Sequence, residues 1–120
     1  LSTAFKISGM DDILRQRLAD DIIVYSGHSA GAMAAAKDIE TYERDDLKIE
    51  EVGAYYGVES VVGGLGLIDE YVIPHANRPE RKSVTKFYQE QVAKIGAEAI
   101  VLNDGDVYIV NGNHKIIKQA

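Results

Sequence analysis

The sequence predicts an α/β layered domain, and three observations support this fold class. Short apolar runs of the kind found in buried parallel strands occur at 21–26 and 70–75. Segments with apolar residues at helical spacing occur at 11–19 and 80–96, so helices alternate with the strands. The chain has 120 residues, of which 46% are hydrophobic, which suits one globular domain with a real core.

The first half of the chain mixes helical, extended and turn-rich patterns. In order, we expect a helix at 11–19, a strand at 21–26, a helix at 30–39, a polar surface connection at 40–51 and a turn-rich stretch at 52–68. The first helix has Ile13, Leu14 and Leu18 on one face. Five glycines between 53 and 66 favour turns with short extended pieces in the last stretch.

The second half of the chain has a simpler pattern. We expect a strand at 70–75, a long amphipathic helix at 80–96, and strands at 98–104, 106–112 and 114–119. Pro74 stops the first strand, and Gly96 closes the helix. The apolar positions of the helix are Val84, Phe87, Tyr88, Val92 and Ile95. Tight turns join the last strands, which predicts antiparallel pairing there.

Charge and composition exclude several function classes. The net charge of −6 argues against a surface for nucleic acid or for an anionic membrane. No apolar run approaches the roughly 20 residues of a spanning helix, and no signal peptide is recognisable. The chain has no Cys, which excludes disulfides and zinc–thiolate sites and fits a reducing, cytoplasmic location.

The stretch "IIVYSGHSAGAMAAA" at 22–36 carries the main chemical signal. Within it, residues 27–31 match G-x-S-x-G, the turn that presents a nucleophilic serine between a strand and a helix. The pentapeptide alone could be a chance tight turn. Because an apolar strand is predicted before it and a helix of small residues after it, we interpret Ser29 as a nucleophile. The N–H of Ala30 would then be one oxyanion-hole donor.

A serine nucleophile needs a base and an orienting carboxylate. His75 is the best base, because it ends a predicted strand where α/β sheets place their chemistry. We interpret His28 as a rim residue and His114 as a solvated loop residue. Asp104 also follows a strand and is the preferred acid, although an Asp-Gly turn would explain it too. Asp69 and Asp106 remain competitors.

Three stretches together resemble a known family. "YSGHSAGAM", "GGLGLIDEYVIPH" and "AIVLNDGDVYIVNG", in that order, are similar to peptidase E (α-aspartyl dipeptidase) serine peptidases, relatives of cyanophycinase. The resemblance runs from about Gly9 to Gly112. It implies a three-layer sandwich with a mostly parallel sheet, flavodoxin-like and similar to class I glutamine amidotransferases. It also implies Ser29, His75 and Asp104 as the catalytic triad.

The same resemblance implies the activity and the partners. The family removes an N-terminal aspartate from dipeptides without a metal or other cofactor, so the expected partner is a small peptide. A cation should read the aspartate, and Arg78, Arg81, Lys82 and Lys86 are the candidates, with the two arginines preferred. Family members are roughly twice as long, with a glycine-rich loop upstream that supplies a second oxyanion donor. We therefore expect the chain to correspond to the C-terminal portion of one catalytic domain. It would form a homodimer or associate with an N-terminal half, and alone it would be inactive.

Other function classes predict different observations. A glutamine amidotransferase would need a Cys at the elbow, which this chain lacks. An α/β-hydrolase using Ser29, Asp69 or Asp104, and His114 would need far more chain. A phosphate-binding turn is disfavoured because the motif has neither a Walker lysine nor a G-x-G-x-x-G spacing. A catalytically inactive or truncated α/β binding module of the same fold remains the alternative, and a serine-directed fluorophosphonate probe would distinguish it.

Overall fold

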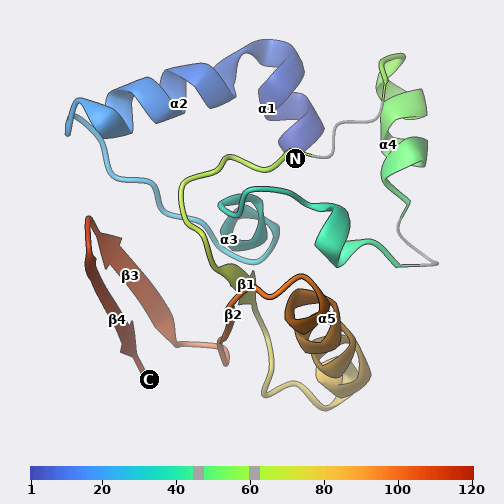
Figure 1. Cartoon of the computed structure of the whole chain (residues 1–120), viewed down its shortest axis with the longest axis vertical. Helices are drawn as coiled ribbons and strands as arrows, with labels where there is room; N and C mark the ends of the chain where they lie inside the picture. The colour runs from blue at the N-terminus through green and yellow to red at the C-terminus, as the bar shows by residue number, and fades with distance from the viewer. Residues whose placement is uncertain (45–47, 60–62) are drawn as a thin grey trace. The chain divides into compact units, whose positions relative to one another are not determined.

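The computed structural model describes residues 1–44, 48–59 and 63–120 of a mixed α/β protein (Figure 1). The chain divides into two compact units, unit 1 (Leu1–Leu67) and unit 2 (Ile68–Ala120). Unit 1 contains helices and irregular chain, whereas unit 2 contains the sheets. Parts of 40–51 and 52–68 lie outside the described residues, so the predictions for those stretches are assessed on the remainder.

Unit 1 begins with two consecutive helices, α1 (Ser2–Ser8) and α2 (Met10–Ala19). Gly9 lies between them with φ of 71°, which glycine adopts without steric cost. Asp11 and Asp12 lie in the first turn of α2, where carboxylates are favourable. Arg15 donates hydrogen bonds to both carboxylates. The predicted helix at 11–19 is confirmed, although Ile13 is exposed.

A helix of small residues, α3 (Ala30–Ala34), packs into the core of unit 1. Ala34, Ala35 and Ala36 are buried, as are Tyr42 and Leu65. The chain at 64–67 runs directly alongside: the Leu65 N–H donates to the Ala34 carbonyl, and two further backbone bonds join Leu67 to Ala35 and Gly66 to Ala36. A Cβ on Gly64 would lie 2.0 Å from the Ala36 carbonyl oxygen, so this approach needs glycine.

Three predictions for unit 1 need correction. The helix predicted at 30–39 ends at Ala34, because the 64–67 segment binds the carbonyls that a longer helix would use. The polar stretch at 40–51 contains the short 3₁₀ helix η1 (Glu40–Tyr42), whose Tyr42 is buried. A helix, α4 (Ile49–Tyr56), replaces the turns expected at 52–56 and ends at Gly57 with φ of 65°.

The strand predicted at 21–26 is also wrong. Residues 22–28 have no regular secondary structure, and no described strand pairs with them. Val24 is 92% exposed and Ile22 59% exposed. A β-branched run favours extended chain, but a strand also requires a hydrogen-bonded neighbour.

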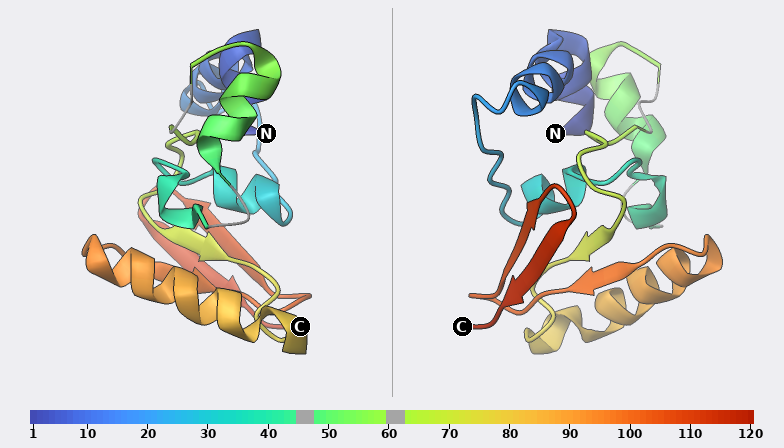
Figure 2. Two further views of the ribbon diagram at one scale, coloured as in Figure 1. Left: turned by 90° about the vertical axis from the view of Figure 1, so that its right-hand side faces the viewer. Right: turned by 60° about the vertical axis from the view of Figure 1, so that its left-hand side comes forward.

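Unit 2 is built on a parallel strand pair with a helical crossover. Strands β1 (Tyr71–Ile73) and β2 (Ala99–Val101) pair in register Tyr71↔Ala99 to Ile73↔Val101. Between them lie the 3₁₀ helix η2 (Pro79–Arg81) and helix α5 (Lys82–Lys94). Figure 2 shows α5 alongside this pair, and α5 contacts both strands.

Helix α5 buries one face against the strands. Tyr88 and Val92, four residues apart, are 2% and 1% exposed, whereas Ile95 is exposed. Gly96 follows the helix with φ of 68° and donates its N–H to the Ala93 carbonyl. The predictions of a strand at 70–75, a helix at 80–96 and a strand at 98–104 are therefore confirmed, with shorter strands.

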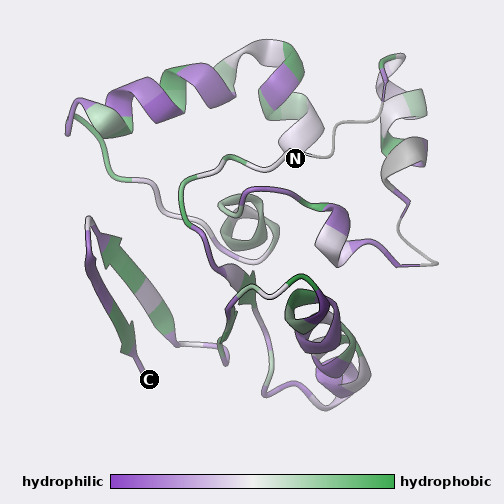
Figure 3. Ribbon diagram, in the orientation of Figure 1, coloured by the Kyte–Doolittle hydropathy of each residue, from purple (hydrophilic) through white to green (hydrophobic). Residues whose placement is uncertain are grey.

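The chain ends in the antiparallel hairpin β3 (Val107–Asn111) and β4 (His114–Lys118), as predicted. Lys115 of β4 forms an ion pair with Glu70, whose side chain is 4% exposed. Figure 3 shows that β3 is coloured largely as hydrophobic. Val107 of β3 and Ile117 of β4 are both exposed. None of the described helices is long and apolar enough to cross a membrane.

Candidate active site

Ser29 occupies a strained turn at the start of α3. Its φ and ψ are 52° and −116°, a conformation that residues other than glycine adopt rarely. Ala30 is the first residue of α3, so its N–H has no intrahelical acceptor. The sequence motif therefore corresponds to a sharp turn into a helix, although the chain before it is irregular.

The first glycine of the motif permits a close approach of the chain to itself. A Cβ on Gly27 would lie 2.6 Å from the carbonyl carbon and oxygen of Gly31 and 2.7 Å from the Ala32 nitrogen. A Cβ added to Gly31 would lie 3.7 Å from its nearest neighbour, the Tyr25 hydroxyl, which is an ordinary van der Waals distance. That hydroxyl donates a 2.7 Å hydrogen bond to the Gly31 carbonyl. Gly27 is thus required by the packing of the turn, whereas Gly31 is not.

His75 lies just beyond the carboxyl end of β1, in unit 2. The pairing of β1 with β2 extends past both strands, because the Leu102 N–H donates to the Ile73 carbonyl and the Ala76 N–H donates to the Leu102 carbonyl. These bonds fix the backbone on both sides of His75, whose φ is 64°. The side chain of His75 is only 12% exposed.

Asp104 lies beside His75, because parallel strands bring their carboxyl ends to one edge. His75 Nδ1 is 2.5 Å from Asp104 Oδ1. Arg78 Nε donates a 2.6 Å hydrogen bond to the other oxygen, Oδ2. The Asp104 backbone N–H donates to Asn77 Oδ1 at 2.9 Å. One carboxylate thus joins a histidine and an arginine from the loop after β1.

These contacts favour the ionised form of Asp104. The Arg78 guanidinium first, and then His75, lower the pKa of Asp104 below its usual value, against a smaller opposing effect of burial. The same contact raises the pKa of Arg78. Asp104 can therefore act as a charged acceptor that orients the His75 ring.

The other histidines and carboxylates considered from the sequence lie elsewhere. Asp106 accepts hydrogen bonds from the backbone N–H groups of Asn103 and Ala120, so it shapes the turn. Asp69 and His28 are exposed, and His114 begins β4 opposite Asn111. Asp104 is in contact with His75.

The four predicted cations differ in their surroundings. Arg78 contacts Asp104, a pairing that the sequence did not reveal because 26 residues separate the two. Arg81 is partly buried, and its Nε has no hydrogen-bond partner among the described residues. Lys82 is exposed, and Lys86 lies 3.9 Å from Glu90 on the same face of α5. The Nε of Arg81 is itself buried, so it is not open to a ligand from solvent.

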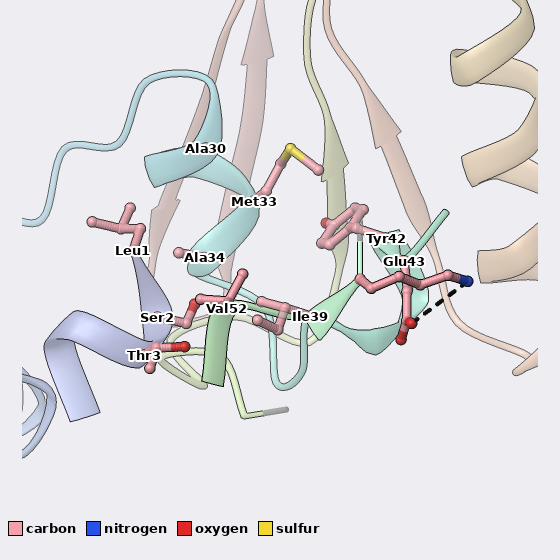
Figure 4. Close-up of a pocket in the computed structure, with 11 residues that line it drawn as sticks. Leu1, Ser2, Thr3, Ala30, Met33, Ala34, Ile39, Tyr42, Glu43 and Val52 are labelled. Carbon is pink, nitrogen blue, oxygen red and sulfur yellow. Dashed lines mark ion pairs between the residues drawn. The ribbon is translucent and has the colours of Figure 1, made fainter. Parts of the chain in front are cut away.

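Unit 1 contains an apolar cavity of about 240 Å³ next to the start of α3 (Figure 4). Its lining residues are Leu1, Ser2, Thr3, Ala30, Met33, Ala34, Ile39, Tyr42, Glu43, Lys48 and Val52. Glu43 and Lys48 form an ion pair with each other at 3.9 Å. Because its lysine is already paired and the remainder is mostly apolar, this cavity does not suit a carboxylate side chain.

The described residues offer no set of metal ligands. No group of three or more His, Asp or Glu side chains gathers there within the reach of one ion.

Comparisons with known proteins connect both units to one family. The family model described as "Peptidase family S51" matches residues 1–118. The structure is similar to that of a "Putative Peptidase E Protein" from Listeria monocytogenes EGD-e, with a TM-score of 0.72 and 21% sequence identity. That match covers 99% of this chain and 54% of the other, so this chain spans about half its length. No curated protein matches the chain significantly.

Proposed function

The chain belongs to peptidase family S51, and from that premise we propose that the protein is a serine-type exopeptidase. Its substrates are dipeptides or related small peptides with an N-terminal aspartate. The contact of His75 Nδ1 with Asp104 Oδ1 at 2.5 Å, at the carboxyl edge of the parallel strands, is the observation that carries the proposal. Such a pair is what a serine nucleophile needs to lose its proton.

In this mechanism each unit supplies one part of the chemistry. The Ser29 hydroxyl attacks the scissile carbonyl carbon and transfers its proton to His75 Nε2, since Nδ1 faces Asp104. The Ala30 N–H stabilises the oxyanion. His75 then protonates the leaving amine, and water releases the acyl group from Ser29 by the reverse sequence. Asp104 stays ionised and holds the imidazole in the required tautomer.

Recognition of the aspartate side chain requires a cation. Arg78 already contacts Asp104, and the cavity of unit 1 is mostly apolar. Arg81 ends η2, three residues after Arg78, and its planar guanidinium suits a carboxylate, which supports it as the group that binds the substrate carboxylate.

The proposal extends to the fold of the whole protein, a three-layer sandwich around a mostly parallel sheet. The exposed apolar chain at 22–26 supports it, because a neighbouring strand there would bury Val24 and Ile22. A cytoplasmic location, and either a homodimer or association with an N-terminal half, remain predictions.

The test combines a fluorophosphonate probe with turnover of an aspartyl dipeptide. We expect the complete protein, this chain together with the N-terminal half expected from the sequence, to be labelled and active, and Ser29→Ala to abolish both labelling and turnover. Ser26→Ala is the matched control, an exposed serine three residues earlier, and should retain both. A protein that binds the dipeptide yet is neither labelled nor active would instead be the catalytically inactive binding module of the same fold.

A further inference from the structure

We propose that Arg78 is a positioning residue, which holds the Asp104 carboxylate in the orientation needed for its contact with His75. Arg78 is then not the residue that recognises the substrate. This inference rests on the proposed function, because it gives Arg78 a part in the same acid–base chemistry. It reverses the expectation from the sequence, in which Arg78 was a candidate for substrate binding.

The two oxygens of Asp104 are divided between two partners. Oδ1 lies 2.5 Å from His75 Nδ1, and Oδ2 accepts from Arg78 Nε at 2.6 Å. Rotation of the carboxylate about its Cβ–Cγ bond would lengthen both contacts together. The contact with Arg78 therefore restricts the rotation that would otherwise misalign Asp104 with the imidazole.

The backbone fixes Arg78 in the position that this contact needs. Its N–H donates to the His75 carbonyl at 3.2 Å, and its carbonyl accepts from the Arg81 N–H at 2.9 Å. Pro79 follows, and it favours the extended φ of −77° and ψ of 125° that Arg78 adopts. Asn77 meanwhile accepts from the Asp104 backbone N–H. The loop after β1 therefore contacts Asp104 through three side chains.

Solvent exposure explains why Asp104 needs a second hydrogen-bond partner besides His75. Asp104 is 39% exposed and Arg78 46% exposed. At such exposure water competes for the carboxylate, and a single contact would hold its orientation weakly. Arg78 also stabilises the negative charge of Asp104, and the hydrogen bond to Asp104 and the charges of Asp104 and Glu80 in turn raise the pKa of Arg78. Asp106, two residues further on, is occupied with the backbone of the turn.

The first measurement follows Asp104 directly, independently of catalysis. In ¹³C NMR titrations of the carboxyl carbon, Arg78→Gln should raise the Asp104 midpoint, because the contact that lowers its pKa most is lost. Arg78→Lys keeps the positive charge but lacks the planar guanidinium. In this variant the Asp104 midpoint should therefore lie between those of the unaltered protein and Arg78→Gln. Lys82→Gln, an exposed cation four residues along, is the matched control and should leave the midpoint unchanged.

The second measurement separates positioning from substrate binding. With an aspartyl dipeptide, Arg78→Gln should lower kcat by about 10- to 100-fold while KM changes little, as is typical when a supporting partner of a reacting group is lost. Amide spectra of each variant establish that it folds. A raised KM with unchanged kcat would overturn the proposal, because it would show that Arg78 binds the substrate.

The two proposals fail in different ways. If the unaltered protein turns over substrate but Arg78→Gln leaves the Asp104 midpoint in place, the positioning role is wrong and the peptidase assignment stands. If no serine-dependent turnover is found yet the midpoint rises, Arg78 does hold Asp104 and the peptidase assignment is wrong.

Discussion

His75 and Asp104 are fixed by a parallel strand pair, whereas Ser29 is fixed by a turn that has no strand ladder beside it. In unit 2 the ladder of β1 and β2 continues to Ala76 and Leu102, directly next to the histidine. In unit 1 the segment before Ser29 is irregular, and Val24 is 92% exposed. The geometry of Ser29 depends instead on the close approach of Gly27 to the first turn of α3.

The difference shows that two kinds of sequence pattern determine different amounts of the structure around them. A βαβ unit completes itself within about 35 residues, so its pairing partner is near in the chain. A nucleophile turn is defined by five residues, but the strand that leads into it needs a neighbour that can come from anywhere. Residues on a local βαβ unit, such as His75 and Asp104, are therefore easier to place from sequence than the serine of the nucleophile motif.

The largest expected effect tests whether the two units act on one reaction. In the complete protein, Ser29→Ala and His75→Ala should each lower kcat by on the order of 10⁴-fold or more, because members of a triad act as a unit. The double variant should lose little further activity. Steady-state kinetics on the three variants decide this, with His114→Ala as an active control. Losses that multiply in the double variant would mean that the two residues act separately.

A smaller effect tests how the turn of unit 1 is held. Gly27→Ala should destabilise the protein by about 1–3 kcal/mol, since its Cβ would meet backbone atoms at 2.6 Å that cannot move aside cheaply. Gly31→Ala is the matched control, because its Cβ has room and alanine favours the helix. Urea unfolding of both variants measures the difference. Equal stabilities would show that the close approach does not hold the turn.

The smallest effect concerns the buried ion pair of unit 2. Lys115→Met leaves the buried Glu70 carboxylate without its cation. It should lower the free energy of unfolding, but by less than Gly27→Ala does, because Lys115 is itself 40% exposed. Lys118→Met, on the same strand, should change the free energy of unfolding by less than about 0.5 kcal/mol. Urea titrations of both variants would show this, and equal losses would exclude a special role for the pair.

The pH dependence of this difference has a definite sign. Burial is the largest single influence on Glu70 and opposes its ionisation. The hydrogen bond and charge of Lys115, with smaller hydrogen-bond contributions from the backbone and Tyr108, together outweigh burial, so the pKa of Glu70 is lowered. A lowered pKa contributes stability above the unfolded-state value of about 4.3, and that contribution is lost as the pH falls. The gap between the unaltered protein and Lys115→Met should therefore be widest near neutral pH and close below about pH 4. A gap that widens on acidification would contradict the assignment.

Much of unit 2 could be predicted from the sequence, and less of unit 1. Helix α5 has a clear apolar stripe and a terminal glycine, and β1 and β2 are short apolar runs at its two ends. Helix α3 ends early for a reason that no local pattern contains, because the distant segment at 64–67 binds its last carbonyls. Helix α4 was missed because Gly53 reads as a turn signal, although it is buried within the helix.

The candidate site shows the same limit. His75 and Asp104 follow predicted strands, so their meeting at one edge of the sheet was foreseeable, and it is confirmed. The contact of Arg78 with Asp104 depends on the path of a loop and on side-chain directions, which residue spacing does not encode. A cation three residues after the histidine and next to a proline is, in retrospect, the only hint in the sequence.

The positive φ angles of Ser29 and His75 have an evolutionary consequence. Asp21 is the other described non-glycine residue with such an angle, and a short polar side chain tolerates it comparatively well. At Ser29 and His75 a glycine would relax the backbone, by roughly 1–3 kcal/mol at each position. Selection for thermal robustness alone would thus tend to erase both residues. With Ser29 and His75 in place, the protein is less stable than the same backbone would be with glycine at these positions. A thermostabilised variant that keeps both residues must gain its stability at other positions.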